Sequence, residues 1–332
     1  MKRLSNLFDK IISLENLIKA DEKARKGKIK SYGVRIHDKH RIENIQKLHE
    51  MLSNGTFHTS KYSVFKVYEP KEREIYRLPY YPDRIVHHAI MNVLEPIWVN
   101  IFTADTCSCI KKRGIMEAHR RMLKYLKDQN GTKYCLKTDI HKFYPSIDHD
   151  CLKIIIRKKI KDVRLLSLLD EIIDSADGVP IGNYLSQYFA NLYLAYIDHQ
   201  IKERLSVKYY IRYADDMVFL SSTKEELANV LKELKVMLSE LKLKLKGNEQ
   251  IFPVGESRKD NHKRGIDFVG FIFYHKQTLI RKSIKKSFAR KCSSLNKKKI
   301  SNKEYKQNIS PWLGWAKYSN SHNLKHKLLP FF

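Results

Sequence analysis

Cysteine is scarce in this chain of 332 residues, which has only 5 cysteines, odd in number and scattered. None of them forms a C-x-x-C pair, so neither a disulfide framework nor a cysteine-based zinc site is expected. The 14 histidines show no paired-ligand spacing, and surface or nucleic-acid-contacting histidines are the simpler interpretation. Long apolar runs and a signal-like N-terminus are also lacking. We therefore expect a cytoplasmic protein of a reducing compartment, with no membrane partner.

Acidic residues are few relative to basic ones. The chain has 36 Asp and Glu against 64 Lys and Arg, which gives a formal net charge of +28. That is far outside the magnitude of roughly 2–8 of a small soluble domain, so a merely soluble basic surface is the weaker explanation. A polyanionic partner explains the excess better, and without a membrane segment the sequence favours nucleic acid.

The last part of the chain carries this imbalance furthest. Residues 281–332 hold 14 Lys or Arg and a single acid, Glu304, interleaved with aromatic residues such as Phe288, Trp312 and Trp315. Basic and aromatic residues on a helical segment suit a surface that follows a phosphate backbone. The alternative is a small helical bundle whose aromatic side chains form its core, and both descriptions can hold at once.

The remaining pattern alternates between helix and strand periods, with no internal repeat and no low-complexity linker. Helical stretches fill residues 1–55, and Asn54-Gly55 ends the second of them. Residues 61–83 alternate as strands do, and a helical pattern follows. The stretch "YLSQYFANLYLAYIDHQIKERL" predicts an amphipathic helix. The strict alternation of Leu and Lys in "LKLKLKGNEQ" predicts a half-exposed strand.

Two adjacent acids interrupt the apolar and aromatic run "YYIRYADDMVFL". Strand propensity is high on both flanks, so the run predicts a β-hairpin with Asp215 and Asp216 at or beside its turn. A third acid, Asp139, ends the apolar strand "YCLKTD", 76 residues upstream of Asp215. Three carboxylates that converge in a basic protein are best explained by divalent cations such as Mg²⁺, which prefer hard oxygen ligands. For the pair taken alone, an exposed Asp-Asp turn is the alternative.

In chain order, "LKTDIHKFYPSID", "GVPIGNYLSQYFANLYL" and "YADD" strongly resemble the palm of reverse transcriptases, and the resemblance extends over roughly residues 61–280. Beside these motifs, "RLPYYPDRIVHHAIMNVLEPIW" resembles the fingers, "IDFVGFIF" a later palm motif and "SPWLGWAKY" the thumb. The resemblance implies an α+β right-hand polymerase fold, with fingers, a palm built on an antiparallel sheet and a helical thumb. It also implies an RNA-directed DNA polymerase that adds dNTPs to a primer or cDNA along a template RNA.

The resemblance assigns roles to the three acids. Asp139, Asp215 and Asp216 correspond to the residues that hold two Mg²⁺ ions, with the backbone carbonyl of Ile140 helping. Asp216 acts either as a ligand or mainly through its field. Two ions about 4 Å apart suit nucleotidyl transfer, since one lowers the pKa of the attacking hydroxyl and the other holds the triphosphate and the leaving oxygen.

Other positions are expected to face the incoming nucleotide. Tyr144 matches the aromatic residue beneath its sugar, where a ring would collide with a 2′-hydroxyl and so select DNA as the product. A packed core tyrosine is the alternative, and it is weaker because Phe143 beside it can take the core position. Lys71 and Arg77 lie in the fingers and could hold either the triphosphate or a template phosphate.

One motif departs from most of the superfamily, which has Gln-Gly followed by Ser-Pro. Here Ile181-Gly182 precedes Ser186-Gln187, and we expect Ile181, Gly182 and Gln187 at the nucleotide site. This pattern resembles the reverse transcriptases of diversity-generating retroelements, which copy a template RNA with errors at adenines during mutagenic retrohoming and work with a small basic accessory protein. The alternatives are a bacterial antiphage-defence or unassigned reverse transcriptase, and a catalytically dead RNA-binding scaffold.

The expected boundaries follow the same resemblance. We expect an N-terminal helical extension over residues 1–60, fingers over 61–135 and a palm over 136–280, with part of the fingers inserted at about 150–183. A basic helical thumb over 281–332 completes the chain. A group II intron protein would normally carry a maturase segment and often an endonuclease, for which 332 residues leave no room, and the "VTG" signature of retron enzymes is absent, so neither class is expected.

Overall fold

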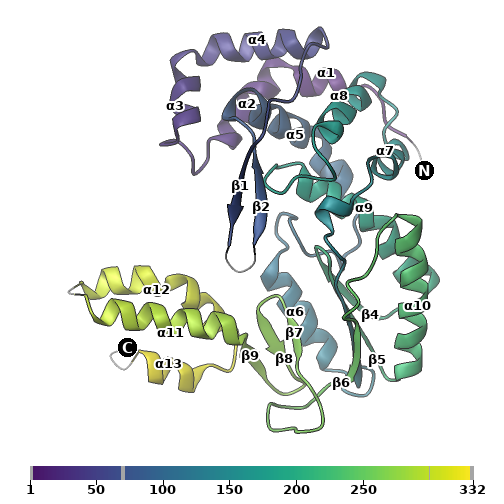
Figure 1. Cartoon of the computed structure of the whole chain (residues 1–332), viewed down its shortest axis with the longest axis vertical. Helices are drawn as coiled ribbons and strands as arrows, with labels where there is room; N and C mark the ends of the chain where they lie inside the picture. The colour runs from purple at the N-terminus through teal and green to yellow at the C-terminus, as the bar shows by residue number, and fades with distance from the viewer. Residues whose placement is uncertain (1–2, 69–71, 299, 330–332) are drawn as a thin grey trace. The chain divides into compact units, whose positions relative to one another are not determined.

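The computed structural model describes residues 3–68, 72–298 and 300–329, which form two compact units of mixed helix and sheet (Figure 1). Unit 1 comprises residues up to 110 together with 140–204 and 234–245. Unit 2 comprises 111–139, 205–233 and the residues from 246 onward. The chain passes between the units several times, so each unit is assembled from segments that are distant in sequence.

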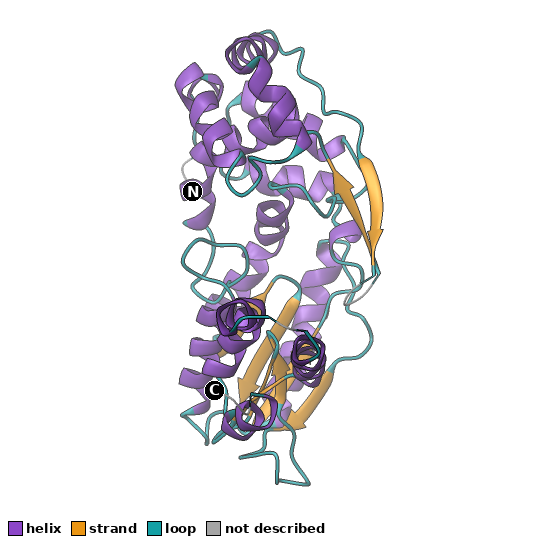
Figure 2. Cartoon of the chain, turned by 90° about the vertical axis from the view of Figure 1, so that its left-hand side faces the viewer, coloured by secondary structure: helices purple, strands orange, loops and turns teal. Residues whose placement is uncertain are grey.

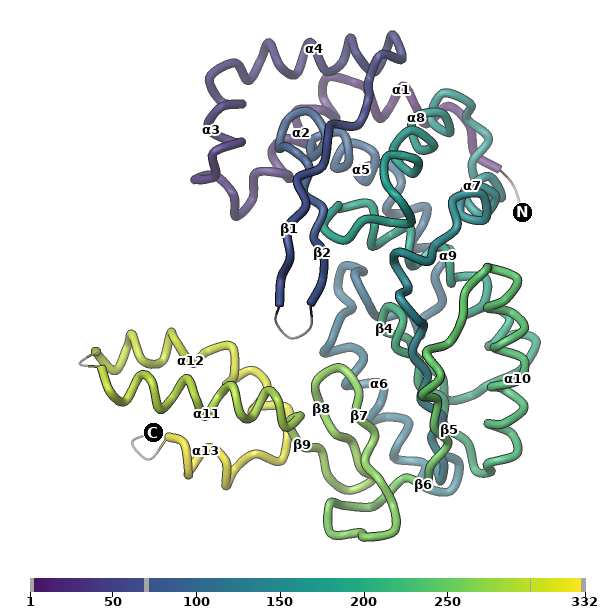
Figure 3. The backbone as a smooth tube through the Cα atoms, in the orientation of Figure 1, coloured from purple at the N-terminus to yellow at the C-terminus, as the bar shows by residue number. Residues whose placement is uncertain are grey.

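Unit 1 is mainly helical and carries one two-stranded hairpin, visible in Figure 3 as two long adjacent segments. Its elements, in chain order, are α1 Phe8–Ile12, α2 Leu14–Ala24, α3 Tyr32–Lys39, α4 Arg41–Ser53, β1 Ser63–Val67, β2 Arg73–Arg77, the irregular turn η1 Tyr80–Arg84, α5 Ile85–Val99, η2 Tyr144–Ser146, α7 His149–Arg157, α8 Val163–Asp174, α9 Ser186–His199 and η3 Gln200–Arg204.

The N-terminal helices form where the sequence predicts them, for local reasons. The Ser13 hydroxyl caps α2 by accepting from the Asn16 N–H, which satisfies one of the donors left open at a helix start. The helix α4 ends at Ser53, and Gly55 follows with a φ of 68°, a left-handed conformation that glycine adopts without strain. The apolar face of α2 packs against α5, so this extension is joined to the helix that follows the hairpin.

Unit 2 contains the larger sheet and ends in three helices. Its elements are α6 Ile115–Leu126, β3 Tyr134–Thr138, β4 Tyr209–Tyr213, β5 Asp216–Ser221, β6 Gln250–Pro253, β7 Ile266–Phe268, β8 Phe271–Phe273, β9 Thr278–Ile280, α11 Lys282–Asn296, α12 Asn302–Lys317 and α13 His322–Leu328. One further helix, α10 Lys224–Glu240, begins in unit 2 and ends among the residues of unit 1.

The central sheet of unit 2 is antiparallel, with the strand order β4-β5-β3-β6. Figure 2 draws the strands of the molecule in orange. Its strands are rich in β-branched and aromatic residues, and Leu136, Tyr210 and Phe219 are fully buried. The helix α6 packs against β4. Burial of this kind stabilises a fold by about 1.5–3 kcal/mol for each large apolar side chain, which fixes the ends of β3 and β5 in space.

The three C-terminal helices of unit 2 have a core of their own, and aromatic side chains belong to it. Phe288 is buried and stacks on Trp312, with ring centroids 6.1 Å apart. Trp315 instead contacts Phe271 of β8 and lies where a Cβ on Gly270 would come within 2.6 Å of its ring. Trp315, which packs closely over Gly270, therefore joins the helices to the small β7-β8-β9 sheet.

Two expectations about secondary structure are wrong. Residues of "LKLKLKGNEQ" form no strand before Gln250; Leu245 makes only an isolated bridge to Ile140, and Lys242 has a φ of 56°, which breaks an extended ladder. The alternation reflects an extended connection in which Leu243 is buried and the lysines face outward. The helix α9 is not amphipathic either, because it is buried on nearly every side.

Across the described ranges, no helix combines the length and the apolar character needed to span a bilayer.

Candidate active site

The Asp215-Asp216 pair lies at the turn of a hairpin, as the sequence predicts. The strands β4 and β5 are antiparallel with Tyr213 opposite Asp216, so Ala214 and Asp215 form a two-residue turn. Ala214 has a φ of 55°, a left-handed conformation that costs a non-glycine residue about 1–2 kcal/mol. The guanidinium of Arg212, which is fully buried, donates to the Ala214 carbonyl over 3.0 Å and so stabilises this turn.

The third acid reaches the same end of the sheet through strand register. The strands β3 and β5 pair antiparallel, and their last partners are Thr138 and Met217. One step further along this register sets Asp139 across from Asp216. Because β3 and β5 are neighbouring central strands, the three acids lie together where these strands meet at one end of the sheet, as expected from the sequence.

Asp216 has unusual electrostatics. Its Oδ1 is buried and lacks a hydrogen-bond partner among the described residues, while its Oδ2 lies 3.4 Å from the Lys137 ammonium. Burial raises the pKa of this carboxyl to about 6, and the negative charges of Asp139 and Asp215 act in the same direction, against the lowering effect of Lys137. Lys137 therefore compensates the charge of Asp216 only in part.

Two lysines that the sequence analysis missed face the acids. Lys137 approaches Asp216 and also donates to the Asp267 carbonyl, and the Lys246 ammonium lies 3.1 Å from Asp139 Oδ2. The backbone N–H of Lys246 donates to the Asp139 carbonyl over 2.9 Å. A signal for Lys137 exists, because Asp139 directly follows the strand β3 and Lys137 stands two positions before it, where alternate residues of an extended chain share a face. For Lys246 there is none, since it is 107 residues away.

A divalent cation fits the chemistry of this donor set. Carboxylate oxygens are the ligands that Mg²⁺ prefers, and the unpartnered Oδ1 of Asp216 is an oxygen without a cation or donor beside it. Within the part of the chain that the structure describes, however, no three His, Cys, Asp or Glu side chains converge closely enough to form a closed metal cluster. The three acids lie at the same end of the sheet, but Asp216 faces Lys137 and Asp139 faces Lys246.

The candidate nucleotide residues lie in unit 1. Tyr144 begins the short turn η2 and is half-buried, whereas Phe143 is buried and takes the core position. The Tyr144 carbonyl accepts from the Val179 N–H over 2.9 Å. Gly178 beside it has a φ of 58°, and a Cβ there would meet the Tyr144 carbonyl oxygen at 2.7 Å. The loop after α8 is therefore closely apposed to the Tyr144 turn.

The Ile181-Gly182 motif packs against strand β2 of the hairpin in unit 1. The Ile181 carbonyl accepts from the Tyr76 N–H over 2.8 Å. Gly182 has a φ of 126°, and a Cβ there would come within 2.5 Å of the Tyr76 carbonyl oxygen. Only glycine combines this backbone conformation with so close an approach, which explains its place after Ile181.

Of the remaining predicted residues, Arg77, Gln187 and Ile140 fall within the described ranges. Arg77 is exposed at the end of β2, and Gln187 is exposed in the first turn of α9. Ile140 is buried immediately after Asp139 and bridges Leu245. Lys71 lies outside the described residues, so its position is not assigned.

The chain matches the sequence profile of a family described as "Reverse transcriptase (RNA-dependent DNA polymerase)" over residues 69–273, more than half its length. It therefore belongs to the reverse transcriptase family, a class of RNA-directed DNA polymerases. This agrees with the family expected from the palm motifs.

Three curated relatives are informative. Protein YkfC of Escherichia coli is 26% identical over 63% of this chain and 67% of its own length. The group II intron-encoded protein LtrA of Lactococcus lactis is 23% identical over 47% of this chain, but the match spans only 28% of LtrA. The nuclear intron maturase 4 of Arabidopsis thaliana is 25% identical over 48% of this chain and 21% of its own length.

Solved structures share the fold at low identity. The apo telomerase of Candida tropicalis aligns with a TM-score of 0.53 at 12% identity, over 75% of this chain and 51% of that chain. A form of that telomerase truncated from its C-terminal domain aligns with a TM-score of 0.50 at 13% identity, over 73% of this chain and 60% of that one. The expected α+β right-hand polymerase fold is confirmed, and the chain spans about half to two thirds of these proteins.

Proposed function

We propose that this chain copies a template RNA into cDNA by nucleotidyl transfer at Asp139, Asp215 and Asp216. The observation that carries the proposal is the β3-β5 register, which continues to set Asp139 opposite Asp216 beside the hairpin turn. In the proposed site these acids hold two Mg²⁺ ions, with the Ile140 carbonyl assisting. When bound, such ions activate the primer 3′-hydroxyl and neutralise charge on the triphosphate.

The two lysines have a supporting role in this proposal. Lys137 and Lys246 each give one acid a positive neighbour, which offsets part of the repulsion among three carboxylates. The two lysines therefore help to keep the strand ends together. Arg212 contributes by holding the strained turn through its bond to the Ala214 carbonyl.

The nucleotide is bound, on this proposal, by residues of the loops around Tyr144. The Tyr144 ring excludes a 2′-hydroxyl and so selects dNTPs. Ile181, Gly182 and Gln187 border the nascent pair, and Lys71 and Arg77 hold the triphosphate. In the terms of a right-hand polymerase, we assign the extension to residues 1–60, the fingers to 61–135, the palm to 136–280 with an insertion of the fingers at about 150–183, and the thumb to 281–332.

We further propose that the enzyme is of the diversity-generating retroelement type. The support is the Ile181-Gly182 and Ser186-Gln187 pattern, in which an apolar branched side chain replaces an amide. Loss of a polar contact weakens discrimination by on the order of 1 kcal/mol, which suits errors at template adenines. The net charge of +28 suits template RNA and cDNA, and a small basic accessory protein is the further partner we expect.

The test is primer extension on one defined RNA in Mg²⁺, followed by sequencing of the product. Complementary copies with errors concentrated opposite adenines would support both parts of the proposal. Accurate copies at all four bases would remove the retroelement assignment and leave a reverse transcriptase. Products unrelated to the RNA would favour an untemplated defence polymerase.

A catalytically dead RNA-binding scaffold is a second candidate, because lysines rather than a closed cluster face Asp139 and Asp216. Absence of any incorporation with Mg²⁺ or Mn²⁺, by protein that still binds RNA, would favour that candidate. Since the site residues occur together with the family's other motifs, we expect incorporation.

A further inference from the structure

His149, the first residue of α7, contacts two segments of unit 1 through its ring. Its Nε2 lies 2.8 Å from the Gly178 carbonyl oxygen, in the loop after α8, and its Nδ1 lies 3.1 Å from Asp174 Oδ1, at the end of α8. Both partners accept hydrogen bonds, so the ring donates to both only when each nitrogen carries a proton. With its side chain 24% exposed, His149 holds these two partners at fixed distances.

The start of α7 is anchored, so His149 reaches the loop from a fixed base. Asp148 caps the helix by accepting from the Cys151 N–H over 3.0 Å, and its second oxygen accepts from the Lys242 ammonium over 2.6 Å. The Asp148 N–H donates to the Tyr193 hydroxyl of α9 over 3.2 Å. The backbone on either side of the helix start is therefore bonded to other parts of unit 1.

Gly178 lies directly against the turn that carries Tyr144. An added Cβ at Gly178 would come within 2.6 Å of the Pro145 carbonyl oxygen, so the two backbones touch. The Val179 N–H donates to the Tyr144 carbonyl over 2.9 Å, whereas the Ile147 N–H of the turn itself lies 3.5 Å from that oxygen. The loop, rather than the turn, therefore provides the shorter hydrogen bond to the Tyr144 backbone.

The later part of the loop is held by other elements. Ser186 Oγ donates to the Pro180 carbonyl over 2.6 Å. The Tyr76 N–H donates to the Ile181 carbonyl over 2.8 Å. These two bonds do not involve His149 and would remain without it. Loss of the His149 ring should therefore loosen the first part of the loop, where it meets the Tyr144 turn, without unfolding the rest.

We propose that His149 is a positioning residue for sugar selection. Its bond to Gly178 holds the loop against the Tyr144 backbone, and the loop in turn fixes the direction in which the Tyr144 ring points. A side chain selects by shape only while its surroundings keep it from moving aside. The proposal rests on the proposed function, because it deepens the role given there to Tyr144. His149 acts through the loop and is assigned no contact with the nucleotide.

Two amides at position 149 separate the two bonds of the ring. The side-chain nitrogen in His149→Gln reaches the place of Nε2 and can still donate to Gly178, whereas that in His149→Asn reaches only the place of Nδ1, towards Asp174. His149→Asn is therefore the test and His149→Gln its matched control. Lys153→Met is a second control, because the Lys153 ammonium lies 2.6 Å from Asp174 Oδ2 and its loss leaves the Gly178 contact intact.

The first readout is the ratio of rNTP to dNTP incorporation efficiency in primer extension on a defined RNA. His149→Asn should raise this ratio roughly fivefold, as expected for the loss of one hydrogen bond, while His149→Gln and Lys153→Met stay within about twofold of the wild type. Added to Tyr144→Ala, His149→Asn should change the ratio no further, because the effects of residues that act through one another do not add.

The second readout needs no synthesis. Hydrogen–deuterium exchange of the Val179 amide reports on its bond to the Tyr144 carbonyl, and peptides that cover residues 175–186 resolve it. Exchange should become at least about fivefold faster in His149→Asn and stay within about twofold of the wild type in both controls. Unchanged exchange in peptides of α9 would show that the variant is folded.

Faster exchange with an unchanged sugar ratio in His149→Asn would overturn the role in selection, and unchanged exchange would overturn the holding of the loop. Equal effects of His149→Asn and His149→Gln would exclude the Gly178 bond as the cause. Additive effects with Tyr144→Ala would show a route that bypasses the ring. Absence of synthesis by the wild type would overturn the proposed function and the role in selection with it, while the exchange rates would still decide whether His149 holds the loop.

Discussion

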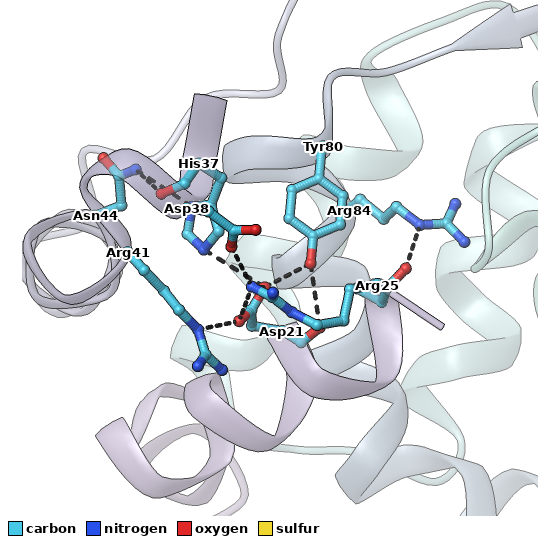
Figure 4. A network of polar contacts seen from close by, with 9 residues as sticks. Asp21, Arg25, His37, Asp38, Arg41, Asn44, Tyr80 and Arg84 are labelled. Carbon is cyan, nitrogen blue, oxygen red and sulfur yellow. Dashed lines mark hydrogen bonds and ion pairs between the residues drawn. The ribbon is translucent and has the colours of Figure 1, made fainter. Parts of the chain in front are cut away.

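Asp21 in unit 1 and Asp216 in unit 2 are carboxylates that are fully or largely removed from solvent, and they differ in the charge of the groups around them. Asp21 is fully buried, yet two arginines, a histidine and a tyrosine hydroxyl surround it (Figure 4). These contacts, led by those of His37 and Tyr80, outweigh the opposing effect of burial and hold the pKa of Asp21 well below the usual range. Asp216 has one lysine and two neighbouring acids, and its pKa rises to about 6. One carboxylate is fully compensated and the other is not.

The difference separates structural from functional roles. A carboxylate whose charge is balanced by neighbouring cations and donors stabilises the protein in its ionised form, and its oxygens are not available to a further ligand. An under-compensated one destabilises the fold at neutral pH and keeps an oxygen available, as the unpartnered Oδ1 of Asp216 shows. Perturbed groups of the second kind concentrate at active sites.

The largest expected effect is on stability, from Asp21→Asn. Removing the charge leaves Arg25 and Arg41 without their buried partner, and breaking such a network costs about 3–5 kcal/mol. Urea unfolding of the wild type and the variant measures it. Asp38→Asn, which removes an exposed partner of Arg25, is the control and should cost less than about 1 kcal/mol. Equal effects would mean that Asp21 is not the centre of the network.

The loss of stability caused by Asp21→Asn should depend on pH. The folded-state pKa of Asp21 is lowered, so its stabilisation is present above the unfolded pKa of about 4 and is lost as the pH falls further. The gap in unfolding free energy between wild type and Asp21→Asn should therefore narrow below about pH 4. A gap that is constant from neutral pH to pH 2 would contradict this origin.

Asp216→Asn should change stability in the opposite direction. Neutralising a carboxylate that is destabilised by burial and by Asp139 and Asp215 should raise the unfolding free energy by about 1–2 kcal/mol in buffer free of divalent cations. Thermal melting with EDTA measures this change. A loss of stability would show that the ion pair with Lys137 outweighs the repulsion, and the comparison with Asp21 would fail.

A smaller effect is expected from Tyr144→Ala, on substrate choice. If the half-buried ring lies beneath the sugar, its removal should raise rNTP relative to dNTP incorporation about tenfold. Phe143→Leu is the matched control, since Phe143 is buried and belongs to the core. The readout is the ratio of single-nucleotide incorporation efficiencies. An unchanged ratio would make Tyr144 a packing residue.

The smallest effect is predicted for Ile181→Gln. An amide at this position should restore a polar contact worth on the order of 1 kcal/mol, and so lower misincorporation opposite template adenines about fivefold, with overall synthesis retained. Deep sequencing of cDNA from one RNA, copied by both proteins, provides the measurement. A wild type that is equally accurate at all four bases would exclude the retroelement type.

Local patterns predict the hairpin and the positions of the acids at the ends of strands, because both depend on short stretches. High strand propensity around two acids predicts the turn between Tyr213 and Asp216, and the end of an apolar run predicts the position of Asp139. The family resemblance then supplied the fold, which the comparisons support.

What the sequence did not reveal depends on pairing across long separations. Asp21 looks like any solvated acid of a helix, and its partner Tyr80 is 59 residues away. Lys246 belongs to the alternating Leu and Lys stretch that predicts a strand, whereas in the structure its side chain contacts Asp139. Neither the partner of a charged residue nor the burial of a helix on all sides, as in α9, is encoded in local periodicity.

The most direct test of the central claim is primer extension by Asp215→Asn with Mg²⁺ on a defined RNA, normalised to RNA-bound protein. If the acids at the edge of the sheet carry out synthesis, the rate should fall by at least about 10²–10³-fold, while RNA affinity stays within about twofold, because the basic surface is unchanged. A rate above a tenth of that of the wild type would contradict the account.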